Sequence, residues 1–369
     1  MTLRIAVVTP IPTPYRDPFW QCLGARKDTA LRVLFCAQGK ADRPWEAGWG
    51  ESLDARVMPG RNLLSWRGPD ASCYWNPSCV RELESFAPQV VLIGGYNHPT
   101  MLAAMRWAQR RGVPFVLMCE TWRIRHGGIK ARLRNALVRR VLRQSAGVLT
   151  TGRRARRFVA HYAGEGKPCS DLPNVPDLEA ITAAAPANRS SPTVARVVFA
   201  GRFIPMKGVG DLIDAFADLP SEVLQHSHLE LIGDGQQRAE LERKIDQYGL
   251  RDQVAFRGFL QHSQVLGAYR AADVFVMPSS ETWGVAPIEA AASGMRVIVS
   301  DEVGCADDLE RFVPACRFPF GNVTALRDAL DVQLRAALAG ERLPATDWKR
   351  WTHQALAEDV SKFLQQLAA

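Results

Sequence analysis

Short apolar runs alternate with helix-length segments along most of the chain, and this alternation constrains the fold more than any other feature. Val, Ile, Leu and Phe occupy both faces of many of these runs. Strands that are apolar on both faces need helices on each side, as in parallel sheets built from βαβ units. The expected strands are Arg4–Thr9, Leu31–Cys36, Val90–Gly95, Pro114–Cys119, Gly147–Thr151, Arg196–Ala200, Leu229–Ile232, Val254–Arg257, Asp273–Met277 and Arg296–Ser300.

A segment rich in proline and alanine, from about Leu172 to Thr193, separates two sets of strands. The pattern predicts an α/β chain of two Rossmann-like parallel-sheet domains that face a central cleft, over residues 1–180 and 190–345. The segment from Trp348 to Ala369 has the pattern of an amphipathic helix. Ligands of such sheets bind beyond the carboxyl ends of the strands, so the loops there are the places to search for a site.

Composition excludes several classes of protein. No apolar run approaches the roughly 18 residues of a membrane span, and the chain starts in a strand pattern without a signal-peptide core. The eight cysteines are scattered without metal-binding or redox spacing, so we expect them to be reduced and structural. These features predict a cytoplasmic protein.

The densest cluster of candidate site residues follows the expected strand Asp273–Met277 and starts a helix. Glu281 lies on the loop and Glu289 in the first helical turn, while Gly284 lets the backbone approach a ligand closely. Free N–H groups at a helix start bind phosphate, and a nearby carboxylate can accept both hydroxyls of a ribose. The segment therefore predicts a site for sugar, diphosphate and ribose in sequence. For Glu289 alone, an acid favoured by the helix dipole is the simpler interpretation.

A second strand, Arg196–Ala200, leads into a Gly-rich loop that carries Arg202 and Lys207 ahead of a helix. Two fixed cations at a helix start suit a diphosphate leaving group, whose negative charge grows as the glycosidic bond breaks. The loop lacks the Gly-Lys-Ser/Thr ending of a Walker A motif. A pair of solvated loop cations is the alternative interpretation.

These two segments resemble the Arg-x4-Lys and Glu-x7-Glu signatures of glycosyltransferase family 4, whose members are retaining enzymes with the GT-B fold. The ordered match extends over about Leu172 to Gly321. The resemblance implies that Arg202 and Lys207 stabilise the diphosphate and that Glu281 holds the donor hexose. It also implies that a C-terminal helix, residues 346–369, packs back on the first domain, which binds the acceptor. The remaining donor contacts implied by the resemblance are Glu289 at the ribose, the backbone of Gly284, Val285 and Ala286, Gly258 and Phe259 at the base, and Gly233.

The first domain matches the family less closely. Its first strand ends in the Pro-rich loop Pro10–Arg16, which offers few N–H donors to a phosphate, so Tyr15 and Arg16 are predicted to contact the acceptor instead. Similar enzymes place a histidine near the transferred sugar at the position of His98. Glu120 is a further acceptor-side candidate. Ordinary polar loop surface would explain His98 and Glu120 equally well.

The charge of the chain is uneven. Twelve Arg or Lys residues and no acid lie between Arg123 and Arg157. We expect a helix here to pack on the sheet through Ile129, Leu133, Leu137 and Val141, with its basic residues outside. An exposed basic face suits an anionic membrane, where each residue contributes roughly 1 kcal/mol, although a merely solvated face is the default interpretation. Nucleic acid is disfavoured because no reading helix or aromatic platform accompanies the charge. The basic residues predicted to contact the membrane are Arg132, Arg134, Arg139 and Arg143.

Together these features predict a metal-independent glycosyltransferase that moves a hexose-type sugar, with retention, from a UDP- or GDP-linked donor. No Asp-x-Asp motif is present, and Arg202 and Lys207 supply the positive charge, so no cofactor or metal is expected. The acceptor would be a hydroxyl of a lipid-linked or other glycan, and the enzyme would lie on the inner face of the membrane in surface-polysaccharide synthesis. Two alternatives remain: a nucleotide-sugar epimerase or hydrolase of the same fold, and a non-catalytic nucleotide-sugar or polyanion-binding protein.

Overall fold

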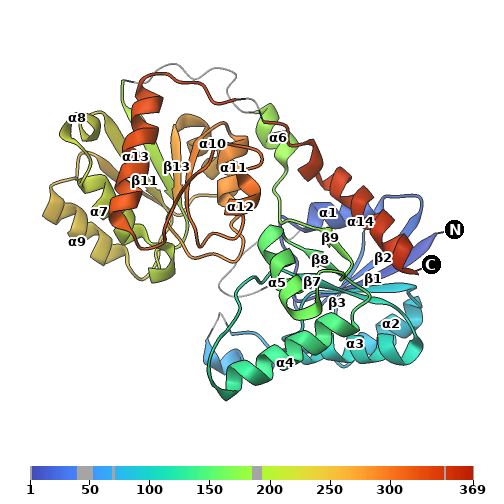
Figure 1. Ribbon diagram of the computed structural model, residues 1–369. Coiled ribbons are helices and arrows are strands. Elements are labelled where there is room, and N and C mark those ends of the chain that lie inside the picture. The colour runs from blue at the N-terminus through green and yellow to red at the C-terminus, as the bar shows by residue number, and fades with distance from the viewer. Residues whose placement is uncertain (1, 40–52, 69–70, 185–192, 345, 369) are drawn as a thin grey trace. The chain divides into compact units, whose positions relative to one another are not determined.

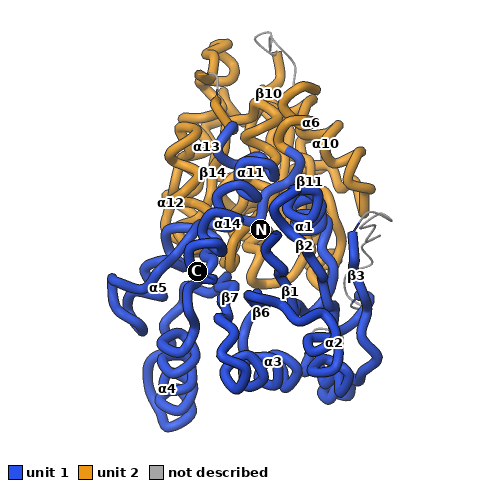
Figure 2. Tube along the Cα trace, turned by 90° about the vertical axis from the view of Figure 1, so that its right-hand side faces the viewer, with its two compact units in different colours: residues 1–177, 349–369 blue, residues 178–348 orange. Residues whose placement is uncertain are grey.

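The computed structural model describes residues 2–39, 53–68, 71–184, 193–344 and 346–368. The chain forms two compact units, which Figure 2 shows in different colours. Unit 1 consists of residues 1–177 and 349–369, and unit 2 consists of residues 178–348. The last helix of the chain therefore belongs to the same compact unit as the first strand.

Unit 1 is built on a parallel sheet with the strand order β3-β2-β1-β6-β7-β8-β9. Its strands are β1 (Leu3–Thr9), β2 (Thr29–Phe35), β3 (Asp54–Val57), β6 (Val90–Ile93), β7 (Phe115–Cys119), β8 (Gly147–Thr150) and β9 (Cys169–Asp171). A two-stranded ribbon, β4 (Arg61–Asn62) and β5 (Tyr74–Trp75), and a short 3-10 helix, η1 (Ser65–Arg67), stand beside it. The order reverses between β1 and β6, and ligands of open parallel sheets bind at such a reversal.

Helices cover both faces of this sheet, as its two-sided burial requires. Figure 1 shows α2, α3 and α4 on one face and α1 and α14 on the other. An added Cβ at Gly147 in β8 would lie 2.6 Å from the Phe363 ring, so α14 rests directly on the sheet. The helices of unit 1 are α1 (Asp17–Gly24), α2 (Cys79–Phe86), α3 (Pro99–Arg111), α4 (Gly128–Gln144), α5 (Arg153–Ala163), η3 (Lys349–Trp351) and α14 (His353–Ala368).

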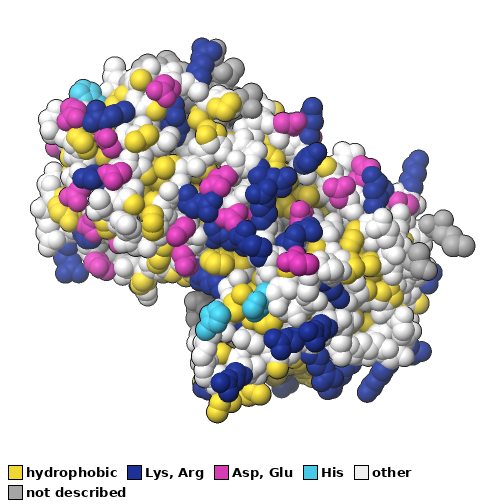
Figure 3. Space-filling view, in the orientation of Figure 1, with side chains coloured by type: hydrophobic (Ala, Val, Ile, Leu, Met, Phe, Trp, Pro, Cys, Tyr) yellow, Lys and Arg dark blue, Asp and Glu magenta, His cyan; other side chains and the backbone are white. Residues whose placement is uncertain are grey.

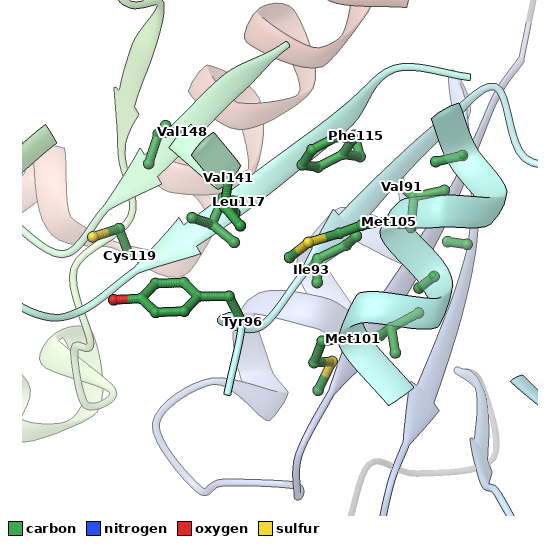
Figure 4. Close-up of a cluster of buried hydrophobic side chains, with 14 of the residues drawn as sticks. Val91, Ile93, Tyr96, Met101, Met105, Phe115, Leu117, Cys119, Val141 and Val148 are labelled. Atoms are coloured by element: carbon green, nitrogen blue, oxygen red, sulfur yellow. The ribbon is translucent and has the colours of Figure 1, made fainter. Parts of the chain in front are cut away.

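The core beneath α3 and α4 shows why the sequence folds this way. Val91 and Ile93 on β6 and Leu117 on β7 point to the same face, and Met101 and Met105 of α3 fill the space above them (Figure 4). Alternate residues of a strand point to the same face of the sheet, and helix residues four apart lie on the same side of the helix. The two sets therefore pack against each other here.

Unit 2 repeats the plan with the parallel order β12-β11-β10-β13-β14-β15, which reverses between β10 and β13. Its strands are β10 (Ala195–Ala200), β11 (Ser227–Ile232), β12 (Val254–Gly258), β13 (Val274–Met277), β14 (Arg296–Ser300) and β15 (Cys316–Phe318). Its helices are α6 (Leu178–Ala183), η2 (Pro205–Lys207), α7 (Val209–Ala217), α8 (Ser221–Leu224), α9 (Arg238–Tyr248), α10 (His262–Ala271), α11 (Ala286–Ala292), α12 (Ala306–Leu309) and α13 (Val323–Leu338).

The predicted fold class, two Rossmann-like parallel-sheet domains, is confirmed, and each of the ten expected strands is present within one or two residues of its predicted ends. The strands β3, β9 and β15 were not expected. They lie at sheet edges and carry polar or charged residues, so they lack the two-sided apolar pattern that identified the others. In the predicted linker, Leu172 and Val175 are buried and α6 follows, while residues 185–192 lie outside the described residues.

The predicted packing of α4 is wrong for three of its four residues. Ile129, Leu133 and Leu137 are 76%, 68% and 41% exposed, and only Val141 is buried as expected. The helix packs through its C-terminal half, where Val138, Val141 and Leu142 form the buried stripe. Ile129, Leu133 and Leu137 lie on the other side of the helix. In the described part of the chain, no helix is both long and apolar enough to cross a membrane.

Candidate nucleotide-sugar site

The loops after β10 and β13 flank the reversal of strand order in unit 2 and are tied together. The Ser280 backbone N–H donates to the Met206 carbonyl oxygen at 2.9 Å. Gly208 has a φ of +65°, and an added Cβ there would lie 2.1 Å from the Pro278 carbonyl oxygen. Only glycine permits this approach, so the local sequence fixes the two loops side by side.

The two loops bring Lys207 and Glu281 together. The Lys207 ammonium contacts the Glu281 carboxylate directly, and their side chains are 14% and 22% exposed. Arg202 lies on the same loop as Lys207 and is exposed. Two of the residues predicted to bind the donor are therefore in contact, and a third stands on the same rim of the sheet.

The Glu281 backbone is held from its other side by the segment after β14. Its N–H donates to the Glu302 carbonyl oxygen at 3.1 Å, and its own carbonyl accepts from Gly304 N–H at 3.2 Å. The Ser280 hydroxyl donates to the Glu302 carboxylate at 3.2 Å. Sequence reasoning missed Glu302, because it lies on a loop without a recognisable motif. These bonds preorganise Glu281 before any ligand arrives.

Helix α11 follows directly and carries Glu289 in its first turn. The helix begins at Ala286, with Pro287 at its second position. Gly284 has a φ of +94° and would place a Cβ 3.0 Å from the Val303 side chain. The backbone from Gly284 to Ala286 thus runs from the Glu281 loop into the helix that bears Glu289.

Glu289 has a partner that the sequence did not reveal. His262, the first residue of α10, places its Nε2 2.8 Å from Glu289 Oε1. The hydrogen bond to Glu289 raises the pKa of His262 above its ordinary value, against the opposing effect of burial. The Glu289 side chain is 12% exposed. A histidine at the start of a helix does not indicate a partner for Glu289 in the sequence. The two residues meet only because α10 packs against α11 in the fold.

Glycines at the ends of β11 and β12 hold the neighbouring loops of unit 2 together. Gly233 has a φ of +127°, and a Cβ there would lie 2.0 Å from the Gly201 carbonyl oxygen. Its N–H donates to the Gly258 carbonyl oxygen at 2.8 Å. Phe259, next along the chain, is 71% exposed. The three adjacent loops are therefore packed backbone to backbone, with one aromatic ring presented to solvent.

In unit 1, the loop after β1 carries Tyr15 and Arg16, and Arg16 points inward. Its guanidinium donates to the carbonyl oxygens of Leu172 at 3.3 Å and Pro173 at 3.5 Å, and it also contacts Asn174. Burial lowers the pKa of Arg16, while Glu120 opposes this effect. The structure gives Arg16 an internal role, and Tyr15 is half-buried beside it.

Glu120 joins the same cluster from the end of β7. Its Oε1 lies 3.8 Å from the Arg16 guanidinium and accepts a hydrogen bond from Asn174 Nδ2 at 3.3 Å. The Glu120 side chain is 53% exposed, so its carboxylate remains accessible. Two predicted acceptor-side residues are thus neighbours, and Asn174, which bridges them, was missed.

His98 precedes α3 and is only 7% exposed. The Tyr74 backbone N–H donates to His98 Nδ1 at 3.3 Å, and the Tyr74 ring lies against the imidazole. A ring nitrogen that accepts a hydrogen bond carries no proton, so the neutral ring has its proton on Nε2. His98 is therefore arranged to donate a hydrogen bond.

The predicted membrane-side residues all lie on α4. Arg132, Arg139 and Arg143 are exposed, whereas Arg134 is half-buried on the inner side of the helix. All eight cysteines are free thiols. In the part of the chain that the structure describes, no group of three or more His, Cys, Asp or Glu residues could hold a metal ion.

Both units of the chain match known protein families. Residues 20–169 match the family described as "Glycosyl transferase 4-like domain", and residues 182–342 match "Glycosyl transferases group 1". The 2-deoxystreptamine glucosyltransferase of Streptomyces kanamyceticus is 29% identical over 212 residues, which are 54% of this chain and 54% of that protein. The chain thus matches this curated relative over about half of its length.

Two solved structures resemble the whole chain. HepE of Anabaena in complex with UDP has a TM-score of 0.70 and 16% identity, over 99% of this chain and 100% of that one. The lipopolysaccharide outer core galactosyltransferase WaaB has a TM-score of 0.71 and 14% identity, over 99% of each chain. The two family matches, which together cover most of the chain, show that it belongs to the group 1 glycosyl transferases, and the structural relatives show that it has the GT-B fold.

Proposed function

We propose that this protein transfers a hexose-type sugar, with retention, from a nucleotide-diphosphate sugar to a hydroxyl of a lipid-linked or glycan acceptor. The observation that carries the proposal is the Lys207–Glu281 contact at the reversal of strand order in unit 2, with Arg202 and Glu289 on the same rim. HepE of Anabaena, which resembles this chain in fold, was solved in complex with UDP. Its ligand supports a uridine donor here.

Lys207 and Arg202 would act on the leaving group. As the bond between the sugar C1 and the phosphate oxygen breaks, negative charge grows on the diphosphate, and fixed cations stabilise it. The Lys207 ammonium is paired with the Glu281 carboxylate. An arriving diphosphate would compete for the Lys207 ammonium and release the Glu281 carboxylate to accept hydrogen bonds from the sugar hydroxyls.

Glu289 would bind the ribose. One carboxylate oxygen accepts from His262, and the other remains to accept from the two ribose hydroxyls. The bond to His262 fixes the orientation of the carboxylate before the nucleotide arrives. The exposed ring of Phe259, at the end of the neighbouring strand, is suited to stack on the base.

The chemical step is a front-face displacement. The acceptor oxygen forms its bond to C1 on the face from which the diphosphate departs, and the acceptor proton passes to the departing phosphate oxygen. No side-chain nucleophile and no metal takes part in this scheme. His98 would contact the transferred sugar, and Glu120 would accept a hydrogen bond from the acceptor.

The acceptor is proposed to be lipid-linked, with the enzyme bound peripherally to the inner face of an anionic membrane. The exposed cations of α4 support this location, because each basic residue near such a surface contributes roughly 1 kcal/mol. WaaB, which has the same fold, acts on the lipopolysaccharide outer core by its name. These two observations support the proposed role in surface-polysaccharide synthesis.

A mass-spectrometric screen tests the proposal. The full chain is incubated with UDP- and GDP-linked hexoses, with and without acceptor lipids extracted from membranes, and the product is examined by NMR for its anomeric configuration. We expect a product one hexose heavier than an extracted lipid, with the donor's configuration retained. A product with inverted configuration, or an epimerised donor sugar without any transfer, would overturn the proposal.

Metal independence has its own test. Transfer should continue at an unchanged rate after exhaustive treatment with EDTA, because Arg202 and Lys207 supply the charge that a divalent ion would otherwise provide. Loss of activity on chelation, followed by recovery with magnesium or manganese, would assign the leaving-group role to a metal.

A further inference from the structure

Helix α4 carries an apolar row that the fold of unit 1 does not use. Ile129, Leu133 and Leu137 are 76%, 68% and 41% exposed. Their spacing of four residues places them along one side of the helix. The buried stripe of the same helix, which includes Val138 and Leu142, lies on the other side. The helix therefore has two apolar faces, of which only one is needed for the core.

Cations surround the exposed row. The exposed basic residues of α4 are Lys130, Arg132, Arg139, Arg140 and Arg143. Within the described residues, none of these five forms an ion pair, and the sequence has no acid between Glu120 and Glu165. In Figure 3 the region of unit 1 over α4 shows hydrophobic and basic side chains and no acidic ones. An apolar strip with basic borders is the pattern of a helix that lies in a membrane interface.

The charges favour one occupant for this face. A second copy of the chain, docked through the same face, would set arginine against arginine around the apolar contact. A nucleic acid would pair with the cations but leave three large apolar side chains in water. An anionic bilayer satisfies both features, because phosphate headgroups lie directly above acyl chains.

We propose that α4 docks unit 1 on an anionic bilayer by inserting Ile129, Leu133 and Leu137 below the headgroups, while the surrounding basic residues bind lipid phosphates. This inference deepens the membrane association in the proposed function, since it names the apolar side chains that hold the protein there. It corrects the interpretation in which charge alone draws the protein to the surface. Insertion and charge attraction differ in their response to salt, because only the second is screened.

Vesicle flotation at two salt concentrations tests the inference. The full chain is mixed with vesicles of phosphatidylglycerol and phosphatidylcholine, or of phosphatidylcholine alone, and floated on a density gradient. We expect flotation with the anionic vesicles at low salt. A substantial bound fraction should persist at about 1 M salt, where the Debye length is about 3 Å.

Two variants separate the contributions of the row and of the cations. Replacing Ile129, Leu133 and Leu137 together by Gln, a good helix former, should lower the partition coefficient about tenfold or more and abolish binding at high salt. Replacing Arg132, Arg139 and Arg143 by Gln should weaken binding mainly at low salt. Val332→Gln is the matched control, because Val332 is 59% exposed on α13 of unit 2 and should not affect flotation.

Equal flotation of the apolar-row variant and the wild type at both salt concentrations would overturn the inference. A wild type that sediments as a dimer without lipid, and a row variant that sediments as a monomer, would assign the row to self-association instead. Circular dichroism and thermal unfolding establish that the variants are folded. Donor hydrolysis in the absence of lipid should be the same in the row variant and the wild type. Failure of the docking is thereby distinguished from failure of the proposed function.

Discussion

The two sheets have the same plan, yet the loops at their reversals of strand order use their charged residues differently. In unit 2, the loops after β10 and β13 present Arg202, Lys207 and Glu281 at an accessible rim. In unit 1, the loops after β1 and β6 direct Arg16 and His98 inward, where they are 9% and 7% exposed. Arg16 donates to the carbonyl oxygens of Leu172 and Pro173 and contacts Asn174, and His98 accepts from the Tyr74 N–H, so both side chains have partners within unit 1.

This difference indicates that position in the fold does not by itself assign a function to a side chain. In unit 2, Arg202 is exposed, and Lys207 lies at the same rim in contact with the Glu281 carboxylate, for which an anionic ligand would compete. The guanidinium of unit 1 instead satisfies carbonyl oxygens that would otherwise be buried without a partner. Substitutions in unit 2 should therefore change activity at constant stability, and substitutions in the Arg16 cluster should change stability first.

The largest effect is expected at Lys207. Lys207→Ala removes a preorganised cation from the leaving group, which typically lowers the rate of catalysis by about 10²–10³-fold. Thermal unfolding should be close to that of the wild type. Lys244→Ala is the matched control, since Lys244 also pairs with a carboxylate of unit 2, Asp214, at 2.6 Å. Equal turnover by the Lys207 variant and this control would remove Lys207 from the mechanism.

Glu289 should contribute to nucleotide binding rather than to the chemical step. Glu289→Ala removes a charged acceptor of the ribose hydroxyls, which is worth about 1.5–3 kcal/mol in the binding of free UDP. Glu281→Ala should instead lower transfer more than UDP binding. Calorimetry with UDP, beside kinetics for each variant, measures both effects. The opposite pattern would mean that the roles of the two carboxylates are exchanged.

Arg16 should behave as a structural residue. Arg16→Ala leaves the carbonyl oxygens of Leu172 and Pro173 without their donor, and we expect the free energy of unfolding to fall by about 1–3 kcal/mol. Arg16→Lys should recover little of this loss, because an ammonium lacks the forked donors of a guanidinium. Arg111→Ala, which breaks an exposed pair with Glu84, is the control and should have almost no effect. A fully stable Arg16→Ala protein that has lost only acceptor binding would contradict the comparison.

A pH-dependent effect is expected at Asp17, which follows Arg16 and is buried. Burial raises the pKa of Asp17 from 3.8 to about 6, although the Thr13 N–H opposes the shift. As pH rises, the unfolded chain loses this proton first, so the contribution of Asp17 to stability falls between about pH 4 and pH 6. Asp17→Asn removes this dependence. Its stability relative to the wild type should therefore grow across this window and level off above it, as denaturant unfolding at several pH values would show. A constant difference would mean that Asp17 ionises normally.

The sequence was most informative where a local pattern determines structure. Two-sided apolar runs identified ten strands, and glycines with charged neighbours identified the loops of unit 2. It could not place His262 beside Glu289 or Asn174 beside Arg16, because 27 and 158 residues separate these partners and no local signal marks either pair. On α4, two apolar rows share one helix, and only the packing of its C-terminal half decides which of them is buried.

Amide hydrogen exchange of the full chain with and without UDP tests the central claim most directly, because it reports separately on the loops of each unit. If unit 2 holds the donor, UDP should slow exchange in peptides that cover residues 201–208 and 279–289, since these loops contact the ligand. The peptide that covers residues 10–17 should exchange at the same rate with and without UDP. Protection confined to residues 10–17, with the loops of unit 2 unchanged, would contradict the assignment of the donor to unit 2.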